Sequence, residues 1–243
     1  MARSRWETDA AGCAYRYPWS AGPRKRSMPR VTTTPSSWPT SGVIRVLVVD
    51  DHPALRAGLA RLLRAETGIE CLAPLAGAER LSEAVRDARP DVVVLDYALG
   101  RGDGLTACFR LKQHPTPPAV ILYSAYVDRP FAVPAAIAQA DATVAKSAPV
   151  DELLGAIRAV ASGHSQRPEL DRELIDAASA RLAAEDLPIA SMLLDATPVP
   201  EIAATLDMSV NDVRIRGLRI IGRLQASDRL TSPATPPDGG LVA

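Results

Sequence analysis

The chain has 243 residues, a hydrophobic fraction of 47%, and 28 acidic and 28 basic side chains, so its formal net charge is zero. This length allows one large domain or two small ones, and zero net charge means that any nucleic-acid contact must come from a local basic patch. No apolar stretch is long enough to span a bilayer. Cys13, Cys71 and Cys108 are widely spaced and include no Cys-x-x-Cys pair, so we expect a reduced, cytoplasmic compartment, with Cys71 and Cys108 as core residues.

Residues 1–42 differ in composition from the rest of the chain. They contain all three tryptophans, five prolines and the basic run Arg24-Lys25-Arg26, without apolar periodicity. We expect a disordered basic extension. An equally weighted alternative is that the start was assigned too early, with Met28 or a start near Val43 closer to the working N-terminus.

From Val43 to about Gly163, short apolar runs alternate with helical patterns, which predicts buried parallel strands joined by crossover helices. We therefore expect a five-stranded, parallel, doubly wound α/β domain of flavodoxin-like size. The expected strands are 44–49, 69–73, 92–95, 120–123 and 142–145, and the expected helices begin at Pro53 or span 78–88, 105–113, 131–138 and 150–162.

Polar side chains follow several of these strands. Asp50 and Asp51 end the first, Asp96 ends the third, Ser124 ends the fourth and Lys146 follows the fifth. Because the carboxyl ends of parallel strands meet at one edge of a sheet, these side chains should converge. Each aspartate alone could simply cap a turn, but crowded carboxylates repel each other unless a cation neutralises them, and such ligands suit Mg²⁺. The set predicts a site that receives a phosphoryl group.

The order of these residues along the chain closely resembles that in the receiver domain of bacterial two-component response regulators. The resemblance implies a CheY-like fold. The resemblance is carried by the segment VVDDHPALRAGL (48–59), Asp96 with Gly104 beyond it, Ser124-Ala125 and Lys146, and it covers residues 43–163. The Asp-Asp-His-Pro-x-x-Arg-x-Gly opening resembles the NarL/FixJ branch, whose members carry a LuxR-type helix-turn-helix.

The resemblance implies roles for individual residues. Asp96 would be the phosphoacceptor, attacking a phosphohistidine of a sensor histidine kinase or a small acyl phosphate. Lys146 and Ser124 would contact oxygens of the phosphoryl group, whose charge Mg²⁺ would neutralise. The implied Mg²⁺ ligands are the side chains of Asp50, Asp51 and Asp96 and the backbone carbonyl of Ala98.

Three positions near this site need separate comment. Gly100 stands where the family usually has a proline, which predicts a more flexible loop, and Thr143 replaces the aromatic residue that usually switches position three residues before the lysine. His52 could act as a ligand or base, but we expect it only to occupy the first βα turn. The residues expected to carry out phosphorylation are thus all present. The aromatic residue that usually transmits phosphorylation to the rest of the domain is absent.

Residues 164–184 are expected to form a linker with a helix near 170–182, residues 185–226 a small all-α domain, and residues 227–243 a disordered tail. Segment 201–214 resembles the core of a LuxR-type helix-turn-helix, with Pro200-Glu201 opening one helix and a Ser209/Asp212 capping box opening the next. Departures from the family include Pro188 inside the expected first helix, so this domain is a degenerate version.

The second helix of this motif has two distinct faces. Val213, Gly217, Ile220 and Leu224 share one face, and a row of arginines lies opposite. The resemblance implies docking in a major groove of promoter DNA, whereas a solvated helix face is the alternative for the arginine row. The predicted DNA-binding residues are Asn211, Arg214, Arg216, Arg219 and Arg223.

Three functions remain in competition. The first is a phosphorylation-dependent transcription regulator, acting in the cytoplasm without membrane contact and as a possible homodimer. The second keeps the receiver but makes residues 185–226 a protein-interaction module, which the apolar Ile215 and Leu218 favour. The third is an enzyme on the same sheet, but a phosphatase would need Asp-x-Asp and a dinucleotide enzyme Gly-x-Gly-x-x-Gly, and both motifs are absent after the first strand. We therefore expect no enzyme.

Overall fold

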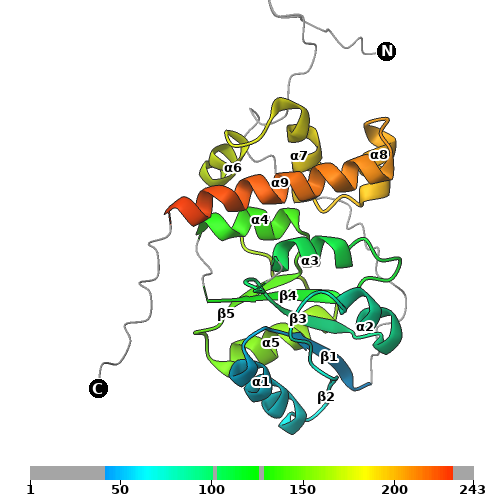
Figure 1. Cartoon of the computed structure of the whole chain (residues 1–243), viewed down its shortest axis with the longest axis vertical. Helices are drawn as coiled ribbons and strands as arrows, with labels where there is room; N and C mark the ends of the chain where they lie inside the picture. Colours follow the sequence, from blue (N-terminus) through cyan, green and yellow to red (C-terminus); the bar gives the residue numbers. More distant parts are fainter. Residues whose placement is uncertain (1–41, 101–102, 126–128, 232–243) are drawn as a thin grey trace, which may run out of the picture. The chain divides into compact units, whose positions relative to one another are not determined.

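The computed structural model describes residues 42–100, 103–125 and 129–231, with side chains described up to Ala226. The predicted N-terminal extension, its tryptophans and Cys13 lie outside the described residues, as does the chain after Thr231. Helices α1 to α9 and strands β1 to β5 in this part are labelled in Figure 1.

The predicted parallel sheet is confirmed. Its strand order, β2-β1-β3-β4-β5, is that of flavodoxin-like folds, and all four neighbouring pairs are parallel. The strands span Ile44–Val49 (β1), Ile69–Cys71 (β2), Val92–Asp96 (β3), Ala119–Ser124 (β4) and Ala142–Ala145 (β5).

Helices cover both faces of this sheet (Figure 1), because alternate side chains of each strand point to opposite faces. Val46 and Val48 of β1 pack beneath α1 and α5, whereas Leu47 and Val49 of the same strand pack beneath the helices of the other face. The covering helices are α1 (Pro53–Ala65), α2 (Leu81–Ala88), α3 (Gly104–Leu111), α4 (Ala132–Ile137) and α5 (Val150–Ala161).

Two expected helices begin later than predicted. Helix α2 begins at Leu81 rather than residue 78, because the Leu81 N–H bonds to the Ala78 carbonyl in a turn instead of a helical repeat. The expected helix over 131–138 is split into a 3₁₀ turn, η2 (Arg129–Phe131), and the short α4. Strand β2 is also two residues shorter than predicted.

The C-terminal helices (α6 to α9) follow the predicted helical patterns. Pro188 does not interrupt α7, because it lies in the first turn, where the missing N–H costs nothing. Helix α9 is continuous and runs past residue 226, where the small domain was expected to end. None of the helices in the described ranges combines the length and hydropathy needed to cross a membrane. The elements are α6 (Arg172–Ser179), η3 (Ala184–Asp186), α7 (Leu187–Leu194), α8 (Val199–Thr205) and α9 (Val210–Thr231).

The C-terminal helices share one hydrophobic core with α3 and α4. Every residue of α4 is buried, and α4 contacts both α7 and α9. Gly217 of α9 lies against Phe109 of α3, so closely that a Cβ atom at position 217 would be 2.5 Å from the ring. Gln225 of α9 also donates a hydrogen bond of 2.6 Å to Asp103, the N-cap of α3. Helix α9 is therefore joined to the α/β domain by apolar and polar contacts.

Candidate functional site

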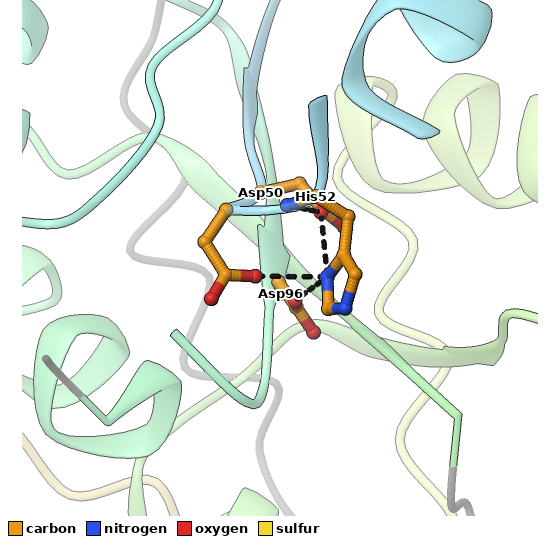
Figure 2. A group of neighbouring side chains, drawn as sticks. Asp50, His52 and Asp96 are labelled. Carbon is orange, nitrogen blue, oxygen red and sulfur yellow. Dashed lines mark hydrogen bonds and ion pairs between the residues drawn. The ribbon is translucent and has the colours of Figure 1, made fainter. Parts of the chain in front are cut away.

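Three carboxylates meet at the carboxyl edge of the sheet. Asp50 follows β1 and is 1% exposed, Asp96 ends β3 and is 3% exposed, and Asp51 is half-buried beside them. Ligand atoms from these residues and His52 all lie within 4.8 Å of one another (Figure 2). The sheet edge thus gathers side chains that are 46 positions apart in sequence, as expected from the ends of parallel strands.

Lys146 supplies a positive charge to these carboxylates. It follows β5, and its Nζ lies 2.8 Å from an oxygen of Asp50 and 2.8 Å from an oxygen of Asp96. Its backbone N–H donates to the Ser124 carbonyl at 2.7 Å, which fixes the lysine to the end of β4. We call Asp50, Asp51, Asp96 and Lys146 the acidic site; with its carboxylates ionised it carries two negative charges in excess.

Burial and charge shift two pKa values in the acidic site. Burial raises the pKa of Asp96 above its ordinary value, although the neighbouring Lys146 and the Ala98 N–H act in the opposite direction. Burial alone would lower the pKa of Lys146, but the hydrogen bonds and charges of Asp50 and Asp96 outweigh it and raise that pKa. The lysine therefore stays protonated at neutral pH. An additional cation beside Asp96 would stabilise the ionised form of its carboxylate.

Backbone amides orient the three carboxylates. The N–H of Ala98 donates to Asp96 at 3.1 Å, that of His52 to Asp50 at 2.8 Å, and that of Gly100 to Asp51 at 2.8 Å. Ala98, the predicted carbonyl ligand, thus adjoins the Asp96 side chain.

A glycine lets α3 begin beside this strand end. The Gly104 N–H bonds to the Tyr97 carbonyl at 2.9 Å, and a Cβ at this position would overlap the backbone oxygen of Asp96. Only glycine permits this approach, which explains the glycine beyond Asp96 in the sequence motif.

His52 lies closer to the carboxylates than the sequence suggested. It occupies the N-cap position of α1, in the first βα turn as expected, but makes no side-chain cap. Its Nδ1 is 2.8 Å from Asp51, 3.4 Å from Asp50 and 3.9 Å from Asp96, and Figure 2 shows the ring directed at the labelled carboxylates. The ring is 66% exposed, so it covers the acidic site from the solvent side. The position of His52 directly after Asp50-Asp51 in the sequence could have indicated this proximity to the carboxylates.

The donor set fits a hard divalent cation. Asp51 Oδ1 is buried and accepts no hydrogen bond from the described residues, although His52 Nδ1 lies 2.8 Å away, and Asp96 Oδ2 is buried with Lys146 Nζ 2.8 Å away as its ion-pair partner. Oxygen ligands and excess negative charge are what Mg²⁺ requires, and Mg²⁺ completes its coordination with water or phosphate.

Comparison with known proteins agrees with this geometry. Residues 46–158 match the response regulator receiver domain. The chain is 27% identical to the transcriptional regulatory protein LiaR of Bacillus subtilis over 201 residues, covering 77% of this chain and 93% of LiaR. It is 28% identical to the response regulator UvrY of Escherichia coli K12, covering 75% of this chain and 88% of UvrY. Residues 46–158 of the chain are thus assigned to the response regulator receiver domains.

A solved structure supports the same assignment. A two-component response regulator of the LuxR family from Aurantimonas sp. SI85-9A1 matches with a TM-score of 0.50 and 29% identity, covering 56% of this chain and 97% of that one. The predicted resemblance to the NarL/FixJ, LuxR-type branch is therefore confirmed, and the matches to LiaR and UvrY cover most of each relative's length. These relatives are named as regulators rather than enzymes.

The positions that the receiver resemblance implies as the switch differ in this chain from the family pattern. Ser124 ends β4 and is 1% exposed, and Thr143 lies on β5 beside a cavity also lined by Phe131, Leu170 and Leu174. Phe131 of η2 packs edge-to-face on Tyr97, directly after Asp96, with ring centroids 5.0 Å apart. An aromatic side chain thus adjoins this region, but it comes from η2 instead of β5.

The predicted DNA-binding residues of this chain fall into two groups. Asn211 and Arg214 are exposed near the start of α9. The others face Asp186, a fully buried residue at the end of η3 that the sequence analysis missed: Asp186 accepts from both Arg219 and Arg223, and Arg216 lies 3.8 Å away. We call Asp186 with Arg216, Arg219 and Arg223 the arginine cluster. The available signal was the acidic pair Glu185-Asp186 directly before the apolar segment that forms α7.

The start of α9 has the predicted cap. The Ser209 hydroxyl accepts a hydrogen bond from the Asp212 N–H at 3.0 Å and lies 2.7 Å from the Asp212 carboxylate. The reciprocal bond of a full capping box, from the Ser209 N–H to the acidic side chain, is replaced by this contact between the side chains.

Proposed function

We propose that this response regulator accepts a phosphoryl group on Asp96 from a sensor histidine kinase and, in response, controls binding of its C-terminal helices to promoter DNA. One observation carries the proposal: Lys146 Nζ lies 2.8 Å from the carboxylates of both Asp50 and Asp96 at the edge of the sheet. Such a cluster holds a nucleophile, a fixed cation and ligands for a metal ion in one place.

Asp96 is the nucleophile in this proposal. One of its carboxylate oxygens forms a bond to phosphorus while the bond between phosphorus and the kinase histidine nitrogen breaks, which gives an aspartyl phosphate. Lys146 pairs with a phosphoryl oxygen as charge develops, and the Ser124 hydroxyl donates to another. When bound, Mg²⁺ neutralises phosphoryl charge; its proposed ligands are Asp50, Asp51, Asp96 and the Ala98 carbonyl.

Helix α9 is the proposed DNA-reading element. Asn211 and Arg214 are exposed near its N-terminal end, where a helix-turn-helix reads bases in the major groove. The contact between Gly217 and Phe109 joins the same helix to α3, whose N-cap follows the phosphorylated strand by seven residues. A movement of α3 on phosphorylation would then change the access of α9 to DNA. The match to LiaR, named as a transcriptional regulatory protein, supports this output.

A protein-interaction module is the second candidate for the C-terminal helices. Ile215 is 55% exposed on α9, close to the proposed base-reading positions, and two arginines of the same helix are bonded to Asp186. An exposed apolar side chain beside partly neutralised arginines suits a protein partner better than a phosphate backbone.

Phosphorylation and DNA binding can be tested together. The full chain is incubated with Mg²⁺ and acetyl phosphate, and intact mass and binding to random-sequence duplex DNA are measured for wild type and Asp96→Asn. We expect one phosphoryl group on the wild type and none on the variant, with DNA affinity that falls steeply as salt rises. A wild type that gains no phosphoryl group would refute the receiver proposal. A phosphorylated wild type that fails to bind DNA at low salt would favour the interaction module.

A further inference from the structure

Gly100 makes a contact with the acidic site that the family's usual residue cannot make. It lies four residues after Asp96, and its N–H donates to Asp51 Oδ2 at 2.8 Å. Proline, the usual residue at this position of the receiver motif, has no N–H to donate. The hydrogen bond therefore depends on the departure from the family pattern in this chain.

The contact also leaves little room for a side chain. A Cβ at position 100 would lie 3.0 Å from Asp51 Oδ2, the same oxygen that accepts the hydrogen bond. Glycine thus provides the donor without crowding the acceptor. Gly100 is not among the described residues with a left-handed backbone, so its role lies in this contact rather than in an unusual φ angle.

The Gly100 amide fixes the orientation of the Asp51 carboxylate. With Oδ2 held by the amide, Oδ1 is the oxygen that lies buried beside His52, without a hydrogen bond from the described residues. A carboxylate that is free to rotate must lose that freedom when a metal binds, whereas one that is already oriented does not. Hydrogen bonds to a charged acceptor are also among the stronger ones in proteins.

We propose that the Gly100 N–H is a positioning group for the divalent cation, holding Asp51 so that Oδ1 faces Asp50 and Asp96. The inference rests on the proposed function, because it assigns a role within the same metal site. It also links the loop between β3 and α3 to the metal: the loop that follows the phosphoacceptor is bonded to a metal ligand on a different strand end.

The test measures binding of Mn²⁺ alone to the full chain by electron paramagnetic resonance, which distinguishes free from bound ion. Gly100→Pro removes the donor, and Gly100→Ala retains it while adding a Cβ. We expect Gly100→Pro to weaken Mn²⁺ binding about tenfold, the usual effect of losing a hydrogen bond to a charged group, and Gly100→Ala to weaken it less. In an Asp51→Ala background, Gly100→Pro should cause no further loss of Mn²⁺ affinity. If the substitution instead disturbed the loop in general, it would weaken binding in this background as well.

A second measurement leaves the loop sequence unchanged, in case Gly100→Pro fails to fold by circular dichroism. The amide proton of Gly100 is followed by NMR in wild type and Asp51→Ala, where loss of the acceptor should move it upfield and speed its exchange. If wild type binds no Mn²⁺, the metal site of the proposed function fails. Three results would overturn only the role of Gly100 when wild type does bind Mn²⁺. These are equal Mn²⁺ affinity of Gly100→Pro, a loss of affinity caused by Gly100→Pro even in Asp51→Ala, and a Gly100 amide that is the same in wild type and Asp51→Ala.

Discussion

The acidic site and the arginine cluster both pair buried carboxylates with cationic side chains, but in opposite proportions. The acidic site sets three carboxylates against one lysine, and the arginine cluster sets one carboxylate, Asp186, against three arginines. With all these groups ionised, the first keeps two negative charges in excess and the second two positive charges. In both, side chains from segments distant in the sequence meet.

This difference indicates which ligand each cluster can accept. Excess negative charge at the sheet edge is stabilised by a divalent cation and, through it, by a phosphoryl group. Excess positive charge on α9 remains available to phosphates of a DNA backbone even though Asp186 neutralises part of it. The arginine cluster is therefore compatible with DNA binding, and its internal pairs also hold α9 to η3.

Removing the single cation from the acidic site should have the largest effect. Lys146→Gln leaves Asp50 and Asp96 facing each other without their fixed counter-charge, and no ammonium remains for the phosphoryl oxygen. We expect phosphorylation by acetyl phosphate to slow about a hundredfold, as for loss of one oriented donor to a developing charge. Initial rates from intact mass measure this. Arg61→Gln, which removes an exposed positive charge from α1, is the matched control, and equal rates for the two variants would contradict the role of Lys146.

Removing the single carboxylate from the arginine cluster tests whether this cluster stabilises the fold. Asp186→Asn keeps the size of a fully buried side chain but leaves its arginine partners without their counter-charge. We expect the melting temperature to fall by roughly 6–10 °C, because uncompensated charge near a buried site is costly. Asp176→Asn on the exposed face of α6 is the control, since its pair with Arg172 is solvent-exposed and worth little. Equal melting temperatures for the two variants would mean that the cluster contributes nothing to the fold.

Two glycines of α9 test the contact between the receiver and the helix-turn-helix. At Gly217 a new Cβ would meet the Phe109 ring, whereas at Gly222 it would meet nothing within 4 Å. Both alanine substitutions raise helix propensity equally, so they differ only in this contact. We expect Gly217→Ala to loosen α9 from α3 and to raise the affinity of the unphosphorylated chain for random-sequence duplex about tenfold, with little change for Gly222→Ala.

Fluorescence anisotropy with labelled duplex measures this difference. Adding Phe109→Ala to Gly217→Ala should restore low affinity if relief of the collision lets α9 return to its contact. Identical affinities for the two glycine variants would show that the receiver does not restrict α9.

Features that depend on residues close together in the sequence could be predicted, whereas contacts between distant segments could not. Alternation along β1 and aspartates at the ends of β1 and β3 are local patterns, and the geometry of a parallel sheet brings those ends together, so the fold and the acidic site were predictable. The contacts of Gly100 with Asp51, Asp186 with Arg219 and Gly217 with Phe109 join residues 49, 33 and 108 positions apart. No periodic pattern specifies them, because they depend on how whole elements pack. The sequence accordingly predicted Arg219 as a DNA-binding residue, with a solvated face as the alternative, and did not indicate its pair with Asp186.

Cys108 gives the smallest expected effect and reports on packing between the two regions. It is fully buried on α3, its thiol donates to the Ala138 carbonyl, and burial raises its pKa to about 12. Since the thiolate is the reactive form, we expect iodoacetamide at pH 8 to leave Cys108 unmodified in the native chain, while the half-buried Cys71 reacts slowly. Peptide mass mapping distinguishes the two sites. Because α3 lies between the sheet and α9, modification of Cys108 in Gly217→Ala but not in Gly222→Ala would show that the loosened contact extends into the receiver core. Equal protection in both would confine the change to the surface of α3.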